Sequence, residues 1–153
     1  MSRAFVKEEE TQDPRCPVPP GCGGAGVPVS QLTLAARLRP DAAARFSGAA
    51  FFCPVPTCEV AYFDAGGERA TRAELVAPVF PKSRGAPLCA CFGVTQEQLE
   101  ELGRRGDKAG MREFLERTAS AQARCEQSAA DGRCCATEAR RVFLRELEAR
   151  GQG

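Results

Sequence analysis

Nine cysteines and no histidine in 153 residues constrain this chain more than any other feature of its sequence. Without histidine, Ser-His-Asp and Cys-His catalysis and every metal site that needs an imidazole ligand are excluded within this chain. Nine thiols exceed what a small core requires, so we expect them to form cross-links or to bind metal. The length fits one ordinary domain, or two very small ones that would need such a supplement.

The cellular compartment decides between cross-links and metals. Residues 1–15 are polar, without the apolar stretch of a secretory signal, and nowhere does the sequence approach the ~20 apolar residues of a membrane span. We therefore expect a disordered leader over residues 1–15 and a cytoplasmic protein with no membrane insertion. In that reducing compartment the cysteines favour metal sites over disulfides. A formal charge of +1 predicts no nucleic-acid partner.

A stretch rich in proline and glycine divides the chain, and we predict a linker over residues 81–88. Residues 16–80 are predicted to be rich in β structure, with a short helix before Pro40 and strands at 49–52, 60–63 and 75–80. Residues 89–150 are predicted to be helical, with helices from the capping box at 95–98 to a break at 103–106, at 109–118, and at 137–150 with Gly151 as the stop. The fold class expected from this pattern is α+β.

The first cysteine group consists of two pairs, one spaced by five residues and one by four. They are Cys16 and Cys22, then Cys53 and Cys58. Each pair lies among prolines and glycines, where backbone N–H groups can turn toward sulfur. Four soft thiolates presented on two turns suit tetrahedral Zn²⁺, with free buried cysteines as the alternative. Because the first pair is widely spaced, Asp13 or water is an alternative to Cys16 as the fourth ligand.

The second cysteine group has a different spacing. It contains Cys89, Cys91, Cys125, Cys134 and Cys135. A Cys-x-Cys pair is too tight for a zinc knuckle, but it can hold one iron of a cluster, and iron–sulfur clusters take four thiolates. Spacing alone leaves open whether this group binds an iron–sulfur cluster or a second zinc ion. It also leaves open whether the adjacent pair at 134–135 is only a buried pair at a helix start.

The residues around both cysteine groups form short motifs typical of a known protein family. In the first region these are Cys22-Gly23, Gly26, Val29, Thr33-Leu34, Leu38, Phe52-Cys53-Pro54, Cys58, Val60 and Tyr62-Phe63. In the second region they are Cys89, Cys91-Phe92-Gly93-Val94-Thr95, Cys125-Glu126 and Gly132-Arg133-Cys134-Cys135. At these residues the chain resembles the N-terminal, zinc- and [2Fe-2S]-containing domain of CopZ-type copper chaperones. The second region also looks like the Bfd-type fold of bacterioferritin-associated ferredoxins.

The resemblance implies a small β-rich zinc-binding half over residues 16–80 and a helical, Bfd-like [2Fe-2S] half over residues 89–150. It implies Cys89, Cys91, Cys125 and Cys135 as cluster ligands, with Cys134 as the alternative fourth ligand. It further implies a metallochaperone rather than an enzyme, giving one-electron redox support to the handling of copper or another thiophilic metal. The family's C-terminal heavy-metal-associated domain has no counterpart in this sequence. The implied partners are therefore copper ion or a separate copper-carrying protein or transporter, and a redox protein.

Two other functions remain open from the sequence. The first is a Bfd-like ferredoxin that passes electrons to or from an oxidoreductase. The second is a structural module that binds zinc, mediates interactions and has no redox role. Visible absorption that bleaches on reduction would favour either redox function over the structural one.

Overall fold

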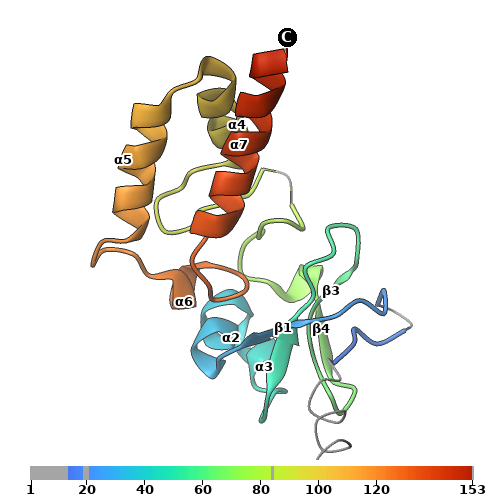
Figure 1. Cartoon of the computed structure of the whole chain (residues 1–153). Coiled ribbons are helices and arrows are strands. Elements are labelled where there is room, and N and C mark those ends of the chain that lie inside the picture. Colours follow the sequence, from blue (N-terminus) through green and yellow to red (C-terminus); the bar gives the residue numbers. More distant parts are fainter. Residues whose placement is uncertain (1–13, 19–20, 84, 153) are drawn as a thin grey trace, which may run out of the picture.

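The N-terminal half of the protein is built on an antiparallel sheet, in which the described residues form four strands in the order β1-β2-β3-β4. The computed structural model describes residues 14–18, 21–83 and 85–152 (Figure 1). The strands are β1 (Val27–Val29), β2 (Ala50–Phe52), β3 (Val60–Asp64) and β4 (Arg69–Thr71). β2 pairs with β3 so that Phe52 lies opposite Tyr62. This pairing brings the loops that flank the two strands, and the cysteines in them, to one end of the sheet.

Two short helices accompany the sheet. They are α2 (Gln31–Arg37), whose first turn is capped by the Ser30 hydroxyl, and α3 (Pro40–Ala43). Leu34 from α2 packs with Phe52 and Tyr62 from the sheet in one buried cluster. Burial of these apolar side chains contributes to the stability of this half.

The C-terminal half is helical. Its helices are α4 (Gln96–Arg105), α5 (Lys108–Thr118), α6 (Cys125–Ser128) and α7 (Ala136–Gln152). α4 packs closely against α7 because Gly103 has no side chain: a Cβ there would lie 2.6 Å from the carbonyl oxygen of Phe143. Leu99, Phe114 and Val142 form the centre of a second buried cluster.

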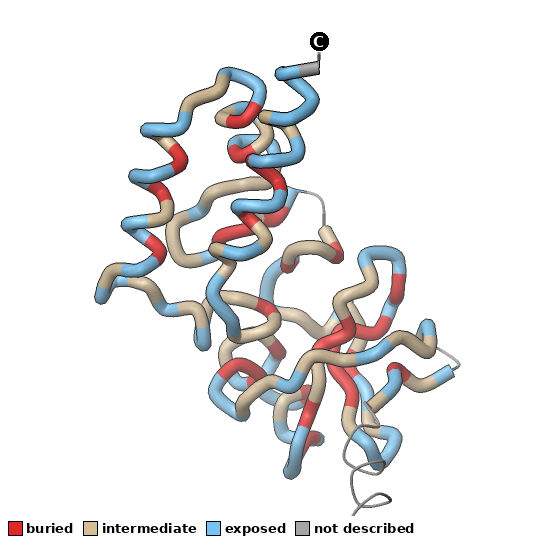
Figure 2. The backbone as a smooth tube through the Cα atoms, in the orientation of Figure 1, coloured by how far each residue is buried: buried red, intermediate tan, exposed pale blue. Residues whose placement is uncertain are grey.

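The two halves are in contact through α6 and the loop that follows it. Figure 1 shows α6 and this loop lying beside α2, below the ends of α5 and α7. Each half has its own buried residues: Figure 2 shows one group among the helices and one in the sheet. Among the residues that the structure describes, no helix is both long and apolar enough to cross a bilayer.

Most of the predicted elements are present. The strands expected at 49–52 and 60–63 are β2 and β3, and the expected helices correspond to α2, α4, α5 and α7. The capping box at Thr95 is confirmed, since its hydroxyl accepts from the N–H of Gln98. Two helix ends were placed wrongly. Gly103 lies inside α4, whose left-handed C-cap is Gly106, and α7 continues past Gly151.

The leader expected over residues 1–15 lies outside the described residues except for Pro14 and Arg15, and Arg15 bridges to Ala25.

The strand expected at 75–80 is wrong. Only Leu75 in this stretch makes a β-bridge, to Leu38, and Pro78 has no N–H to donate to a ladder. The fourth strand is instead β4, which follows a tight turn in which Asp64 Oδ1 accepts from the N–H groups of Gly66 and Glu68. Within the predicted linker, Lys82 and Ala86 are buried.

Candidate metal centres

In the first centre, backbone hydrogen bonds position the two cysteine pairs. Cys16 N–H donates to the carbonyl of Gly24, so the segment that carries Cys16 and Cys22 folds back on itself before β1. Cys53 directly follows β2, and its N–H donates to the carbonyl of Ala61 in β3. The turn that follows closes with a hydrogen bond from Cys58 N–H to the carbonyl of Val55.

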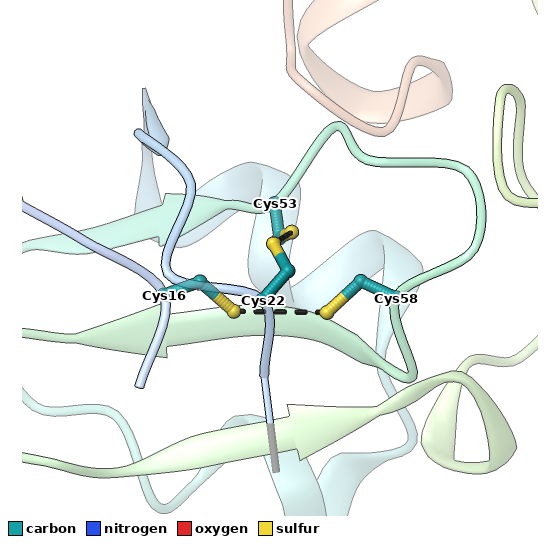
Figure 3. Close-up of side chains that lie close together, drawn as sticks. All are labelled: Cys16, Cys22, Cys53 and Cys58. Atoms are coloured by element: carbon teal, nitrogen blue, oxygen red, sulfur yellow. Dashed lines mark hydrogen bonds between the residues drawn. The ribbon is translucent and has the colours of Figure 1, made fainter. Parts of the chain in front are cut away.

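These turns bring the four sulfur atoms together. Cys16 Sγ lies 3.8 Å from Cys58 Sγ, and Cys22 Sγ lies 3.7 Å from Cys53 Sγ (Figure 3). All four sulfurs lie within 4.8 Å of one another. Four sulfurs placed about 2.3 Å from a tetrahedral centre are about 3.8 Å apart, so the geometry fits Zn²⁺ closely. Cys16 lies with the other three, whereas Asp13, its alternative, is outside the described residues.

Burial shapes the electrostatics of this centre. Cys16, Cys53 and Cys58 are buried, and Cys22 is exposed. Desolvation raises the pKa of Cys16 and brings the pKa of Cys53 to about 12. Desolvation acts in the same sense on Cys22, but hydrogen bonds from the N–H of Gly24 and from Cys53 outweigh it and lower its pKa. Burial thus favours the protonated thiol at Cys16 and Cys53, and a bound dication would displace those protons.

A buried lysine supports the turn between Cys53 and Cys58. Lys82 Nζ donates to the carbonyl oxygens of Val55, at 2.7 Å, and Cys58, at 3.1 Å. Its charge also acts to lower the pKa of Cys53, against the larger effect of desolvation. Four thiolates around Zn²⁺ carry a net charge of −2, so this ammonium is well placed to offset part of it. No sequence pattern marks this role, because a lysine in a turn-rich linker is expected to be exposed.

The second centre is assembled from three segments. Cys89 is buried in a tight loop closed by a β-bridge to Val94. Cys91 Sγ lies 3.7 Å from Cys125 Sγ at the start of α6, and the N–H of Arg124 lies 3.1 Å from Cys91 Sγ. The third segment is the loop before α7, which carries Cys134 and Cys135.

The thiols of this group influence one another through close contacts. Desolvation is the largest cause of the raised pKa of Cys125, about 12, followed by hydrogen bonds with Cys91 and Cys134. Desolvation likewise raises the pKa of Cys135, and a hydrogen bond with Cys89 adds to the rise. Cys91 thus contacts Cys125, and Cys89, Cys91 and Cys135 pack in one cluster. An iron–sulfur cluster takes four thiolates, so the donor set is sufficient for one.

The second set lies beside an opening between the two halves. A cavity of about 350 Å³ is lined by Cys134 and Cys135 together with Phe52 and Arg37. Cys134 is exposed, whereas Cys135 is partly buried against the helical core. A small ion or molecule can thus approach this set of thiols from solvent on the Cys134 side.

Two further residues near the second set were not predicted as part of a site. The Tyr62 hydroxyl donates to the carbonyl of Ala130 at 2.5 Å, and the Thr33 hydroxyl donates to the carbonyl of Glu126 at 2.6 Å. Tyr62 also packs in the core of the sheet half. No local pattern marks either contact, because the partners lie 68 and 93 residues away along the chain.

Comparison with known proteins gives consistent matches. A family profile for the CopZ zinc binding domain (zf_CopZ) matches residues 13–76. The copper chaperone CopZ of Archaeoglobus fulgidus is 31% identical over 127 residues, which are 79% of this chain. The chain spans only 57% of the length of that relative. The X-ray structure of the Archaeoglobus fulgidus CopZ N-terminal domain superposes with a TM-score of 0.64 at 30% identity, covering 84% of this chain and 96% of that one.

Proposed function

Because this chain belongs to the family of the CopZ zinc-binding N-terminal domain, we propose that it serves copper handling as a cytoplasmic protein that carries zinc and a [2Fe-2S] cluster. In this proposal residues 16–80 form the zinc-binding region, 81–88 connect the regions, and 89–150 form the cluster-binding region. The protein supplies electrons to copper rather than acting as an enzyme. Its partners are copper ion and a separate copper-carrying protein or transporter.

The zinc ion has a structural role in this proposal. Cys16, Cys22, Cys53 and Cys58 would hold it, and four protein ligands leave no open coordination position for a substrate. Binding of such an ion becomes part of the folding free energy of the half that contains it. Three of the four ligands are buried, which supports a stable rather than a transferable ion.

The contact between Cys91 and Cys125, with an N–H aimed at the sulfur of Cys91, is the observation that carries the redox part of the proposal. Cys89, Cys91, Cys125 and Cys135 would hold the cluster, and N–H groups near sulfur tune its potential. When bound, a [2Fe-2S] cluster supplies one electron at a time, enough to convert Cu²⁺ into the Cu⁺ that thiolate ligands select. The exposed Cys134 and the adjoining cavity give copper a path toward these thiols.

The test is copper reduction by the purified, iron-loaded protein. After reduction under anaerobic conditions, addition of Cu²⁺ with a Cu⁺-specific chelator should yield about one Cu⁺ per cluster, because each cluster stores one electron. Cys91→Ser, which removes a proposed ligand, should lose this yield. Lys108→Met, an exposed residue at the start of α5, should keep it. A yield that is the same in the Cys91 variant and the wild type would contradict the proposal.

A comparison in cells separates copper handling from general electron transfer. Cells that lack this protein should tolerate copper stress less well than cells that contain it. Unchanged copper tolerance, together with fast electron exchange with a purified flavoprotein, would instead favour a ferredoxin-like partner of an oxidoreductase.

A further inference from the structure

The segment 125–135 carries three of the five thiols in the second set, yet its backbone is held by the zinc-binding half. Two of its backbone carbonyls accept long-range hydrogen bonds from side-chain hydroxyls of that half. Thr33 on α2 donates to the carbonyl of Glu126, and Tyr62 on β3 donates to the carbonyl of Ala130. Thr33 and Tyr62 are both 0% exposed, so neither hydroxyl has solvent as a substitute partner.

Packing follows the same pattern as these hydrogen bonds. Ala130 is buried in the cluster that contains Leu34, Phe52 and Tyr62, which is the core of the sheet half. Gly132 adopts a left-handed conformation (φ 70°) directly over Thr33, where a Cβ would come within 2.7 Å of the Thr33 hydroxyl. Segment 125–135, which includes α6, thus packs closely against α2 and β3.

The remaining thiols of the set belong to the helical half. Cys89 is part of the buried cluster that contains Leu99 and Val142, and Cys91 packs against that cluster. Cys135, at the start of α7, also packs against this cluster. The contact between Cys91 and Cys125 therefore joins a loop of the helical half to a segment whose backbone is bonded to the sheet half. The set is complete only when the two halves are docked.

We infer that Thr33 and Tyr62 are positioning residues of the second metal centre. They hold residues 126–130 so that Cys125 meets Cys91, while Cys135 packs with Cys89 in the helical half. The inference rests on the proposed function in so far as the centre binds a [2Fe-2S] cluster. It makes the zinc-binding half a support for the cluster rather than an independent module. Loss of the Tyr62 hydroxyl leaves the carbonyl of the buried Ala130 without this donor, and loss of the Thr33 hydroxyl removes the bond to Glu126. Either change frees the segment to move away from Cys91.

The test removes each hydroxyl with little change in shape. Thr33→Val and Tyr62→Phe are compared with wild type in the full, zinc-loaded chain. Thr118→Val is the matched control, because that buried hydroxyl donates to the carbonyl of Leu115 inside α5. Thr33→Ser keeps the hydroxyl and serves as the rescue variant.

Two readouts are needed. In iron-free protein, amide hydrogen exchange over residues 126–132 should be about tenfold faster in Thr33→Val and Tyr62→Phe. Loss of one such hydrogen bond should raise the equilibrium constant for local opening by about a factor of ten. Exchange over 96–105 should not change. In iron-loaded protein, the same two variants should lose visible absorption to an iron chelator about tenfold faster, with zinc content unchanged. Thr33→Ser and Thr118→Val should match wild type in both measurements.

The outcomes distinguish this inference from the proposed function. Exchange over 126–132 at the wild-type rate in both variants would overturn the inference. Faster exchange spread equally over both halves, or loss of zinc together with iron, would also overturn it, because the hydroxyls would then act only on general stability. A wild-type chain that takes up no iron while the exchange results hold would contradict the proposed function and leave the structural role of the two residues supported.

Discussion

The ammonium group of Lys82 lies 2.7 Å from the carbonyl oxygen of Val55, inside the turn that presents Cys53 and Cys58. Lys82 is only 4% exposed, and its second bond goes to the carbonyl of Cys58. A lysine this deeply buried is rare unless its charge is compensated. The zinc–tetrathiolate centre that we propose, with its net negative charge, would provide that compensation.

Replacing Lys82 by methionine should therefore destabilise the zinc-binding half. The change leaves two carbonyl groups without their donor and removes a positive charge beside the thiolates, at an expected cost of about 1–3 kcal/mol in the free energy of unfolding. Denaturant unfolding of the zinc-loaded chain measures this. Lys108→Met, at the exposed start of α5, should change stability by less than about 0.5 kcal/mol. Equal stability of the two variants would show that Lys82 has no supporting role.

Replacing Cys53 by serine should abolish zinc binding and unfold the N-terminal half, because the metal contributes to the folding of the half that holds it. Cys58→Ser should behave in the same way, since its sulfur lies 3.8 Å from that of Cys16. Zinc quantification and circular dichroism measure both effects, with Cys134→Ser as the control that keeps zinc. Full zinc content in both variants would mean that the four sulfurs are not the zinc site.

The adjacent thiols at 134 and 135 should differ in importance. Cys135 is partly buried and contacts Cys89, whereas Cys134 is exposed. We expect Cys135→Ser to lose the visible absorption of the cluster and Cys134→Ser to retain most of it. Absorption spectra after anaerobic reconstitution make the comparison. Equal loss in both variants would indicate that the pair is required as a unit.

Replacing Gly103 by alanine should separate α4 from α7. The new methyl group would meet the carbonyl of Phe143 and the Cβ of Glu146, and such overpacking typically costs about 1–3 kcal/mol. Gly151→Ala is the matched control, because that glycine is helical and has open space around it, so a small gain of up to about 1 kcal/mol is expected. Thermal unfolding of both variants measures the difference. A neutral Gly103→Ala would show that the two helices do not depend on this contact.

The sequence predicted what depends on local chemistry. The two cysteine pairs on proline and glycine turns, the capping box at Thr95 and the amphipathic helices were all visible as short patterns. β1 and β4 were missed because each is only three residues long and is stabilised by its neighbour rather than by its own composition.

Long-range contacts could not be predicted from the sequence. The burial of Lys82 depends on carbonyl groups more than twenty residues away, and the hydroxyls of Thr33 and Tyr62 bond to a loop in the other half. A threonine or tyrosine in a core-like pattern looks the same whether its hydroxyl holds a distant loop or not. These residues therefore entered the candidate site only through the structure.

Metal and sulfide analysis of the anaerobically purified protein measures whether the chain carries both zinc and a [2Fe-2S] cluster. We expect one zinc ion per chain together with iron and acid-labile sulfide in the amounts of one [2Fe-2S] cluster, with visible absorption that bleaches on reduction. Two zinc ions per chain, with no iron or sulfide retained after reconstitution, would contradict it and identify a structural zinc module instead.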